Sequence, residues 1–412
     1  GSGTPGPAVK TLEVRLQFAL DEVLLVGTLA LHERRCYFEF DPAFLASGLQ
    51  ISPFKFPAQS GLIEHREREF GPLPGVFDDS MPDGWGRLLM DRRFRQQGLD
   101  PASISPLQRL AWLGTRTMGA LTYHPCGASD APTPLQLRQV ALEVDQVLKG
   151  NTATELPELL RAGGSPGGAR PKLLVGLQGD LLLSGEDELP NGYTHWLVKI
   201  PTVSDGRDAG RVEFAYAHMA GAAGVDMPPV RLLPAGPRID CFAIQRFDRA
   251  AGQRRLHMHS LANLLHADFR TPSLDYTDLL RVTQLLTRNQ HDVARAYRRM
   301  LFNVAAHNRD DHGKNFAFLM TPAGEWSLSP AFDLCPSSGP GGEHSTSVMG
   351  EGRNPTREHC LALAGKAGLR AAQARTMIDE VNAAVTRWTE FADAGRLTRK
   401  RSTEVGAKLR VL

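Results

Sequence analysis

Cysteine is scarce in this sequence, and no two cysteines are spaced as a metal site requires. There are five of them at wide spacing and no C-x-x-C pair: Cys36, Cys126, Cys241, Cys335 and Cys360. An odd number at such spacing argues against a disulfide scaffold or a structural zinc site, and it favours a reducing compartment. Long apolar runs are also missing, because no stretch of about 18 such residues occurs, so we expect no membrane span and a cytoplasmic protein.

An excess of charge of one sign is missing too. The 412 residues carry a formal net charge of only +2, so bulk charge does not require a nucleic-acid partner. With 42% hydrophobic and 22% charged residues, the composition is typical of a globular protein with a sizeable core. Residues 1–10, GSGTPGPAVK, lack the layout of a signal peptide, and we interpret them as an expression scar with a loose end.

The first third of the chain predicts a module of strands and short helices at 11–125. LEVRLQF alternates apolar and polar residues, and VLLVGTLAL and CYFEF follow after turn-sized gaps. A helix is expected from near Pro82 to Gly98, capped by Asp79 or Ser80, and another over 106–114. The loop-like stretch 126–134 is the expected boundary.

The rest of the chain predicts two lobes. A helix is expected near 135–150, followed by a glycine-rich stretch, strands, a helix over 213–225 and two more strands. From Leu261 onward the pattern is mainly helical, interrupted at 307–315 and 336–353. We therefore expect an α+β architecture, with a small mixed sheet lobe over 135–250 and a larger helical lobe over 251–412.

The stretch GGSPGGARPK (163–172) is open to two interpretations. Its glycines allow backbone N–H groups to converge on one anion, and Arg170 and Lys172 add positive charge, which is typical of a phosphate-binding loop. A plain flexible turn is the alternative, and the pattern is not that of a P-loop NTPase. Lys199 in HWLVKIP is similarly open: it either pairs with phosphates in a cleft or points to water from an edge strand.

The stretch HNRDDHGKNFAF (307–318) carries the densest cluster of functional side chains. Asp310 and Asn315 are five residues apart, the spacing of a base and a metal-binding amide in a kinase catalytic loop. Asp310 is preferred to Asp311 because only Asp310 has this spacing. Asp333 follows an expected strand pair, FAFLM and WSLSP, and is either a metal ligand or a simple turn aspartate. Together the signals predict phosphoryl transfer.

These residues also resemble a known family, the HipA toxins, which are kinases of bacterial toxin–antitoxin pairs with a protein-kinase-like fold. The resemblance covers nearly the whole chain. The motifs that carry it are FDDSMPDGWGRLL, MGALTYHP, GGARPK, HWLVKIP, AIQRFDR, NRDDHGKNFAF and LSPAFDL.

The resemblance implies a role for each matching residue. Asp310 would be the catalytic base, Asn315 and Asp333 would hold Mg²⁺, and Ser165 would be autophosphorylated, which would switch the kinase off. The ATP site would comprise the phosphate loop, the phosphate-pairing lysine, the hinge strand against adenine, and residues of the catalytic and metal-binding loops: Gly167, Gly168, Ala169, Arg170, Pro171 and Lys172; Lys199; Gln245, Arg246 and Phe247; His312, Gly313, Lys314 and Asn315; Phe332 and Asp333.

The resemblance also implies partners. The antitoxin would be a helix-turn-helix protein that binds DNA, with module 11–125 as part of the partner surface, so this chain would reach DNA only indirectly. Trp85 and Trp112 are expected in the core rather than as anchors of that surface. The substrate would be a translation protein such as an aminoacyl-tRNA synthetase. The loop 341–352 is expected to be a disordered connector rather than a substrate-facing segment.

Three alternatives stay open at this point. The first is a small-molecule kinase of the aminoglycoside or choline type, which shares the aspartate and asparagine spacing. The second is a metal-dependent hydrolase that uses His307, Asp310, Asp311 and His312, although no further ligands complete its shell. The third is a non-catalytic corepressor, against which the filled catalytic positions argue.

Overall fold

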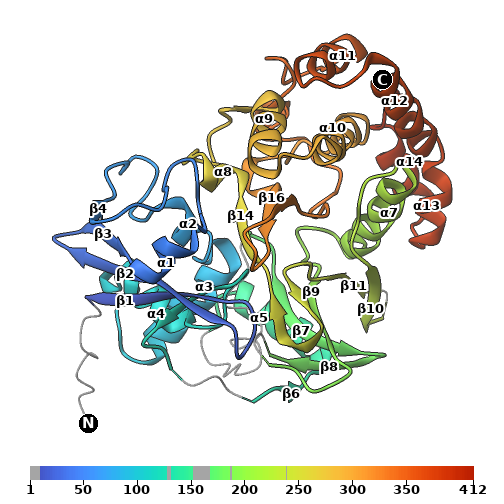
Figure 1. Cartoon of the computed structure of the whole chain (residues 1–412). Helices are drawn as coiled ribbons and strands as arrows, with labels where there is room; N and C mark the ends of the chain where they lie inside the picture. Colours follow the sequence, from blue (N-terminus) through green and yellow to red (C-terminus); the bar gives the residue numbers. More distant parts are fainter. Residues whose placement is uncertain (1–9, 128–130, 152–167, 186–187, 238) are drawn as a thin grey trace.

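The N-terminal module is built on an antiparallel sheet of strand order β4-β3-β2-β1-β5 (Figure 1). The computed structural model describes residues 10–127, 131–151, 168–185, 188–237 and 239–412. Along β1, alternate residues face the core, as the sequence predicted. The strands are β1 (Thr11–Gln17), β2 (Val23–His32), β3 (Arg35–Phe40), β4 (Leu62–Glu64) and β5 (Leu121–His124).

Short helices complete the module: α1 (Pro42–Ser47), α2 (Gly75–Asp78), α3 (Gly84–Gln96) and α4 (Pro106–Leu113). The start of α3 lies near Pro82 as predicted, but the predicted cap was wrong, because Asp83 is the N-cap residue. Asp79 is unavailable as a cap because its carboxylate accepts hydrogen bonds from the backbone and hydroxyl of Ser260, far along the chain. Ser80 instead bonds the hydroxyl of Tyr123. Tertiary contacts thus decide where this helix begins.

The second sheet forms the small lobe and has strand order β10-β11-β9-β7-β8-β6. Its strands are β6 (Thr133–Pro134), β7 (Lys172–Gln178), β8 (Leu181–Ser184), β9 (Thr194–Lys199), β10 (Val230–Gly236) and β11 (Ile239–Gln245). Helices α5 (Leu137–Leu148) and α7 (Ala209–Ala222) cover opposite faces of it. Alternate residues of β11 show this, since Ala243 packs with α5 and Phe242 packs with α7.

Trp85 of α3 is also part of the core under this sheet and is 1% exposed, which confirms the expected core position. Trp112 is half-buried, with the guanidinium of Arg116 4.4 Å from its ring centre. The module and the small lobe therefore share a core through α3.

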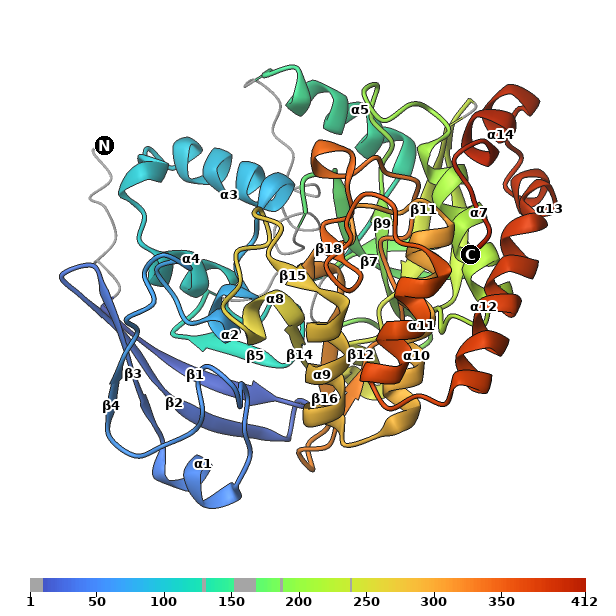
Figure 2. The ribbon, with the colours of Figure 1, turned by 90° about the horizontal axis from the view of Figure 1, so that it is seen from above.

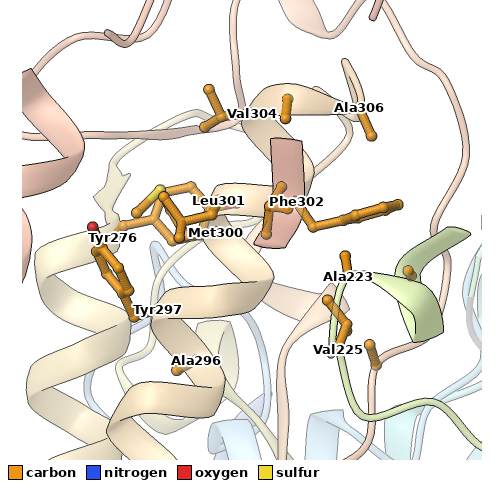
Figure 3. Packing of buried hydrophobic residues seen from close by; sticks show 14 of the residues in the cluster. Ala223, Val225, Tyr276, Ala296, Tyr297, Met300, Leu301, Phe302, Val304 and Ala306 are labelled. Atoms are coloured by element: carbon orange, nitrogen blue, oxygen red, sulfur yellow. The ribbon is translucent and has the colours of Figure 1, made fainter. Parts of the chain in front are cut away.

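The large lobe is helical, as expected from Leu261 onward. Its helices are α8 (Leu261–Leu264), α9 (Tyr276–Thr287), α10 (Gln290–Ala305), α11 (Arg357–Lys366), α12 (Ala371–Thr386), α13 (Trp388–Ala394) and α14 (Arg399–Gly406). Figure 2 shows α11 to α14 on the side away from the N-terminal module. The core centres on α10, where Met300 and Leu301 lie close to Tyr276, beside Tyr297, and the ring of Phe302 points to the other side (Figure 3). No helix in the described part of the chain combines the length and apolarity that crossing a bilayer requires.

Short strands complete the large lobe. β14 (His257–Ser260), β16 (Ala317–Met320) and β17 (Trp326–Leu328) form one sheet, and β16 and β17 are the strand pair predicted from the sequence. The remaining short strands are β12 (Arg249–Ala250), β13 (Arg254–Arg255), β15 (Leu274–Asp275) and β18 (Thr346–Ser347). The disordered-connector prediction for 341–352 was wrong, because β18 pairs with β15 and this segment packs against the loop after α10.

Candidate active site

A cavity of about 880 Å³ lies where the module and the two lobes meet. Its wall brings together polar residues that are hundreds of positions apart in the sequence. The module contributes Asp79, Ser80 and Asp83, the small lobe Lys172, Lys199 and Glu213, and the large lobe Asp310, His312, Lys314, Asn315 and Asp333.

Lys199 is the last residue of β9 and points into this cavity. Because β9 lies between β11 and β7, the edge-strand interpretation was wrong. The ammonium group of Lys199 donates a hydrogen bond to Glu213 Oε1 at 2.5 Å, and it also contacts Asp333 Oδ1. A single buried cation thus joins a helix of the small lobe to a loop of the large lobe.

The charges of Lys199, Glu213 and Asp333 shift one another's pKa values. Burial alone lowers the pKa of Lys199, but Asp333 and Glu213 outweigh it, so the pKa lies above its ordinary value. Burial raises the pKa of Asp333, but Lys199 and Lys172 outweigh it, so the pKa lies well below its usual range. Burial dominates at Glu213 and leaves its pKa raised. Lys199 and Asp333 are therefore both charged at neutral pH.

Glu213 is the functional residue that the sequence prediction missed. The helix was expected to start at Glu213, but α7 begins at Ala209, so Glu213 lies one turn inside it and faces Lys199. Glu213 is 5% exposed, and a carboxylate is rarely buried without a partner. The sequence did contain a signal for this role, since Glu213 lies on the first helix after the strand that carries Lys199.

Asp310 lies on the cavity wall, and its side chain is 57% exposed. Partial burial raises the pKa of Asp310 above its ordinary value, His312 opposes this shift, and Asp333 adds to it. His312 Nε2 lies 3.9 Å from Asp310 Oδ1. The side-chain amide of Asn315 donates to the backbone oxygen of Asp310 at 2.7 Å and so fixes the loop between them.

Asp311 has a different place from its neighbour Asp310. Its carboxylate is buried and accepts hydrogen bonds from the hydroxyl of Tyr276 at 2.6 Å and from the backbone of Ser345 at 2.9 Å. His344 Nδ1 lies 2.8 Å from it. Asp311 thus ties the loop after α10 to the segment 341–352 rather than facing the cavity.

A multi-ligand metal cluster of the hydrolase type finds no support here. Among the residues that the structure describes, no group of three or more His, Cys, Asp or Glu side chains is placed to hold a metal ion. His307 does not line the cavity, and burial lowers its pKa to about 4. Asp310 and Asp311 point apart.

The described end of the glycine loop borders the cavity through Gly168, Ala169, Arg170 and Lys172. Ser165 and Gly167 lie outside the described residues. Pro171 does not line the cavity; its backbone oxygen accepts from Ile200 at 3.0 Å and aligns the loop with β9. Gly313 does not line it either and packs against Ala262, where a Cβ atom would have no room.

Another part of the cavity wall carries aromatic rings. Gln245 ends β11, Arg246 and Phe247 follow it, and all three line the cavity. The rings of Phe247 and Phe332 lie 5.6 Å apart. Lys314 also lines the cavity, with its ammonium group 3.5 Å from Asp78 and 4.8 Å from the ring centre of Phe269. The cavity wall thus carries cations and, beside β11, a pair of tilted aromatic rings that we call the apolar slot.

Asn315 and Asp333 fit the chemistry of a magnesium site. Both are oxygen donors of the kind that Mg²⁺ prefers, and both line the same cavity. Because the amide nitrogen of Asn315 donates to the backbone of Asp310, the amide oxygen is turned away from that carbonyl. Lys199 contacts only one carboxylate oxygen of Asp333. Each residue thus keeps an oxygen for a cation.

Comparison with known proteins places the chain. Residues 19–124 match the family model of the HipA N-terminal domain, and residues 164–388 match that of the HipA-like C-terminal domain. A Sinorhizobium fredii protein named "Putative kinase Y4dM" is 27% identical over 80% of this chain and 77% of its own length. The HipA chain of a Shewanella oneidensis HipA, HipB and operator DNA complex shares the fold, with a TM-score of 0.70, 19% identity and 96% of each chain covered.

The kinase-like α+β fold expected from the sequence is confirmed by that structural likeness. The C-terminal match alone spans more than half of the chain. The chain belongs to the HipA family.

Proposed function

We propose that this chain is an ATP- and Mg²⁺-dependent protein serine/threonine kinase and the toxin of a HipBA-like toxin–antitoxin pair. The observation that carries the proposal is the buried Lys199–Glu213 pair, which contacts Asp333 in a cavity that Asp310 and Asn315 also line. Kinases require such a lysine–glutamate pair together with a metal-binding aspartate. The name of the Sinorhizobium relative and the presence of HipB in the Shewanella complex agree with the proposal.

In this proposal the residues act by position and charge. Asp310 accepts the proton of a substrate serine or threonine hydroxyl as its oxygen attacks the γ-phosphorus of ATP, and ADP leaves. Lys199, Lys172 and Arg170 neutralise the phosphates, and His312 and Lys314, which line the same cavity, would also face them. Asn315 and Asp333 would hold Mg²⁺, which adds charge neutralisation at the phosphates.

The adenine base would lie in the apolar slot beside the hinge. Gln245, Arg246 and Phe247 offer backbone groups to its edge, and Phe332 offers an apolar face. The guanidinium of Arg246 is engaged by Asp248, and its backbone N–H donates to the carbonyl oxygen of His195 at 2.9 Å, so its own carbonyl oxygen would be the group available to adenine. Gly168 and Ala169, which line the cavity, would lie over the phosphates.

The proposal also covers the partner of the kinase, its substrate and its autophosphorylation. A HipB-like helix-turn-helix antitoxin would bind the chain and mediate any DNA contact, since the net charge of +2 does not require this chain to bind DNA itself. The substrate would be a translation protein such as an aminoacyl-tRNA synthetase, and Ser165 would be the autophosphorylation site. None of the five cysteines forms a disulfide bond, which fits a reducing cytoplasm.

The test is phosphate transfer from radiolabelled ATP, compared between wild type and Asp310→Gln. We expect the variant to lose about 10²- to 10⁴-fold of the rate, the usual contribution of a general base. Asp393→Asn, on the exposed face of α13, is the matched control and should keep full activity. No incorporation by wild type would favour the corepressor, and phosphorylation of small amino alcohols or sugars alone would favour a small-molecule kinase.

A second measurement identifies the substrate. Phosphoproteomes of cells that express wild type or Asp310→Gln are compared, and sites that only wild type phosphorylates name the target. A phosphopeptide at Ser165 that is absent from Asp310→Gln would support self-inactivation. No wild-type-specific site in any protein would contradict the toxin proposal.

A further inference from the structure

The N-terminal module touches the glycine loop directly, at the first turn of α3. The carboxylate of Asp83 accepts a hydrogen bond from the backbone N–H of Gly168. The backbone N–H of Trp85 donates to the carbonyl oxygen of Gly168 at 3.1 Å. The module thus bonds both the backbone N–H and the carbonyl oxygen of Gly168.

The use of Asp83 here is unusual for its position. As the N-cap residue of α3, an aspartate ordinarily bonds the free N–H groups of its own helix. Asp83 makes no such capping bond. Its side chain is turned instead toward the loop that borders the cavity.

Two glycines allow this close approach. Gly84 has φ +44°, and a Cβ atom there would lie 2.5 Å from Cα of Ala169 and 2.6 Å from the carbonyl oxygen of Gly168. Gly168 has φ +99°, and a Cβ atom there would overlap the ammonium group of Lys172. The contact is therefore backbone against backbone, with Lys172 directly beneath it.

Asp83 also acts on Lys172 by charge. Lys172 is buried, and burial lowers its pKa, while the carboxylates of Asp333 and Asp83 oppose that shift. An Asp83 that stays in place therefore favours the charged form of a lysine on the cavity wall. The carboxylate thus supports both the backbone of the loop and the cation below it.

The module is in turn fixed to the two lobes, so Asp83 has a defined position between them. The backbone N–H of Gly119 donates to Asp248 beyond the hinge at 2.7 Å. On the other lobe, Asp79 accepts from the backbone of Ser260 at 2.7 Å. A module held at both ends acts as a rigid support for the loop that it touches.

We propose that Asp83 is a positioning residue for the phosphate side of the ATP site, and that the N-terminal module thereby forms part of the nucleotide site. The proposal rests on the kinase function proposed above. Asp83 makes no contact with the reacting atoms; it acts through Gly168 and Lys172. Its loss should therefore weaken ATP binding while leaving the chemical step nearly intact.

The experiment compares Asp83→Ala and Asp83→Asn with wild type in the full chain. Affinity for Mg-ATP is measured by fluorescent-nucleotide displacement, and KM for ATP and kcat by phosphate transfer. We expect Asp83→Ala to raise Kd and KM for ATP about tenfold, the usual effect of one hydrogen bond to a charged group. The value of kcat should stay within about twofold, because the transition-state contacts remain. Asp83→Asn keeps an acceptor oxygen and should recover much of the affinity.

Two further variants separate positioning from simple loss of folding. Gly84→Ala inserts a methyl group between α3 and Ala169 without changing any charge, and it should also weaken ATP binding. Gly98→Ala, at the other end of α3, has a similarly positive φ of +77° but open space around it, so it controls for backbone strain. Asp21→Ala, on an exposed turn of the module, controls for loss of a carboxylate.

Hydrogen exchange of the peptide that contains Gly168 reports the contact independently of ATP. We expect faster exchange in Asp83→Ala and Gly84→Ala, and wild-type exchange in Gly98→Ala and Asp21→Ala. If wild type binds ATP and Asp83→Ala binds it equally well, this proposal alone is overturned. If wild type binds no ATP, the proposed kinase function fails, and the positioning role fails with it.

Discussion

The buried carboxylate of Asp248 makes a strong prediction about stability. Its side chain is 1% exposed, and it accepts from Arg246 at 2.7 and 2.9 Å and from Arg249 at 2.8 Å. The backbone N–H of Gly119 adds a fourth bond, which joins the module to the hinge. Asp248→Asn keeps the shape but removes the charge and places its one NH₂ group against at least one guanidinium group. It leaves buried cations without their counter-charge.

The magnitude follows from burial. Removing one partner of a buried ion pair costs about 3–5 kcal/mol, because the remaining charge stays out of water. The entropy of unfolding is about 2.1 cal/mol/K per residue, so a chain of this length that unfolds as one unit should lose about 4–6 °C in Tm. The arginines also hold the pKa of Asp248 below its usual range, although burial opposes them. This stability is therefore present above pH of about 4 and declines as pH falls.

Differential scanning fluorimetry at pH 7 measures this loss. The matched control is Asp180→Asn, which breaks the ion pair with Arg231, where the aspartate side chain is 94% exposed. An exposed pair contributes little, so we expect the Tm of the control to stay within about 1 °C of wild type. If Asp248→Asn melts within about 1 °C of its control, our account of the buried cluster is refuted.

Three further predictions concern the cavity and its support. Glu213→Gln should lower kcat/KM for ATP about 10- to 100-fold, measured by phosphate transfer, because Lys199 loses a charged partner. The pKa of Asp333 lies below its ordinary value and that of its partner Lys199 lies above, so both are charged from about pH 5 to 9. The Tm difference between Asp333→Asn and wild type should therefore be constant over this range and shrink below about pH 4, where Asp333 becomes protonated. Gly75→Ala would place a methyl group 2.8 Å from a carbonyl carbon of α8 and should cost about 1–3 kcal/mol in urea unfolding, whereas Gly71→Ala, with open space, should cost little.

Local patterns were enough to predict many of the elements. The alternation of LEVRLQF predicted β1, and the run PLQRLAWLG predicted α4, whose capping box begins at Ser105. The polar turn TPAGE predicted the pairing of β16 with β17. Such features depend on neighbours a few residues apart, so the sequence alone contains the cause. The order of glycine loop, strand lysine and Asp-x-x-x-x-Asn likewise led to residues that line one cavity.

Contacts between distant residues decided the rest. Asp79 was predicted to cap α3, but it bonds Ser260, 181 residues further on, and Asp83 takes the cap position. Glu213 was expected at the start of its helix, but α7 starts one turn earlier, at Ala209, and the fold places the side chain of Glu213 against Lys199. Local propensity does not encode such pairings, because a carboxylate has many possible donors and the fold selects among them. The sequence determined which chemical groups and which elements exist, and the tertiary structure decided which carboxylate meets which cation, since burial makes only the partnered arrangement stable.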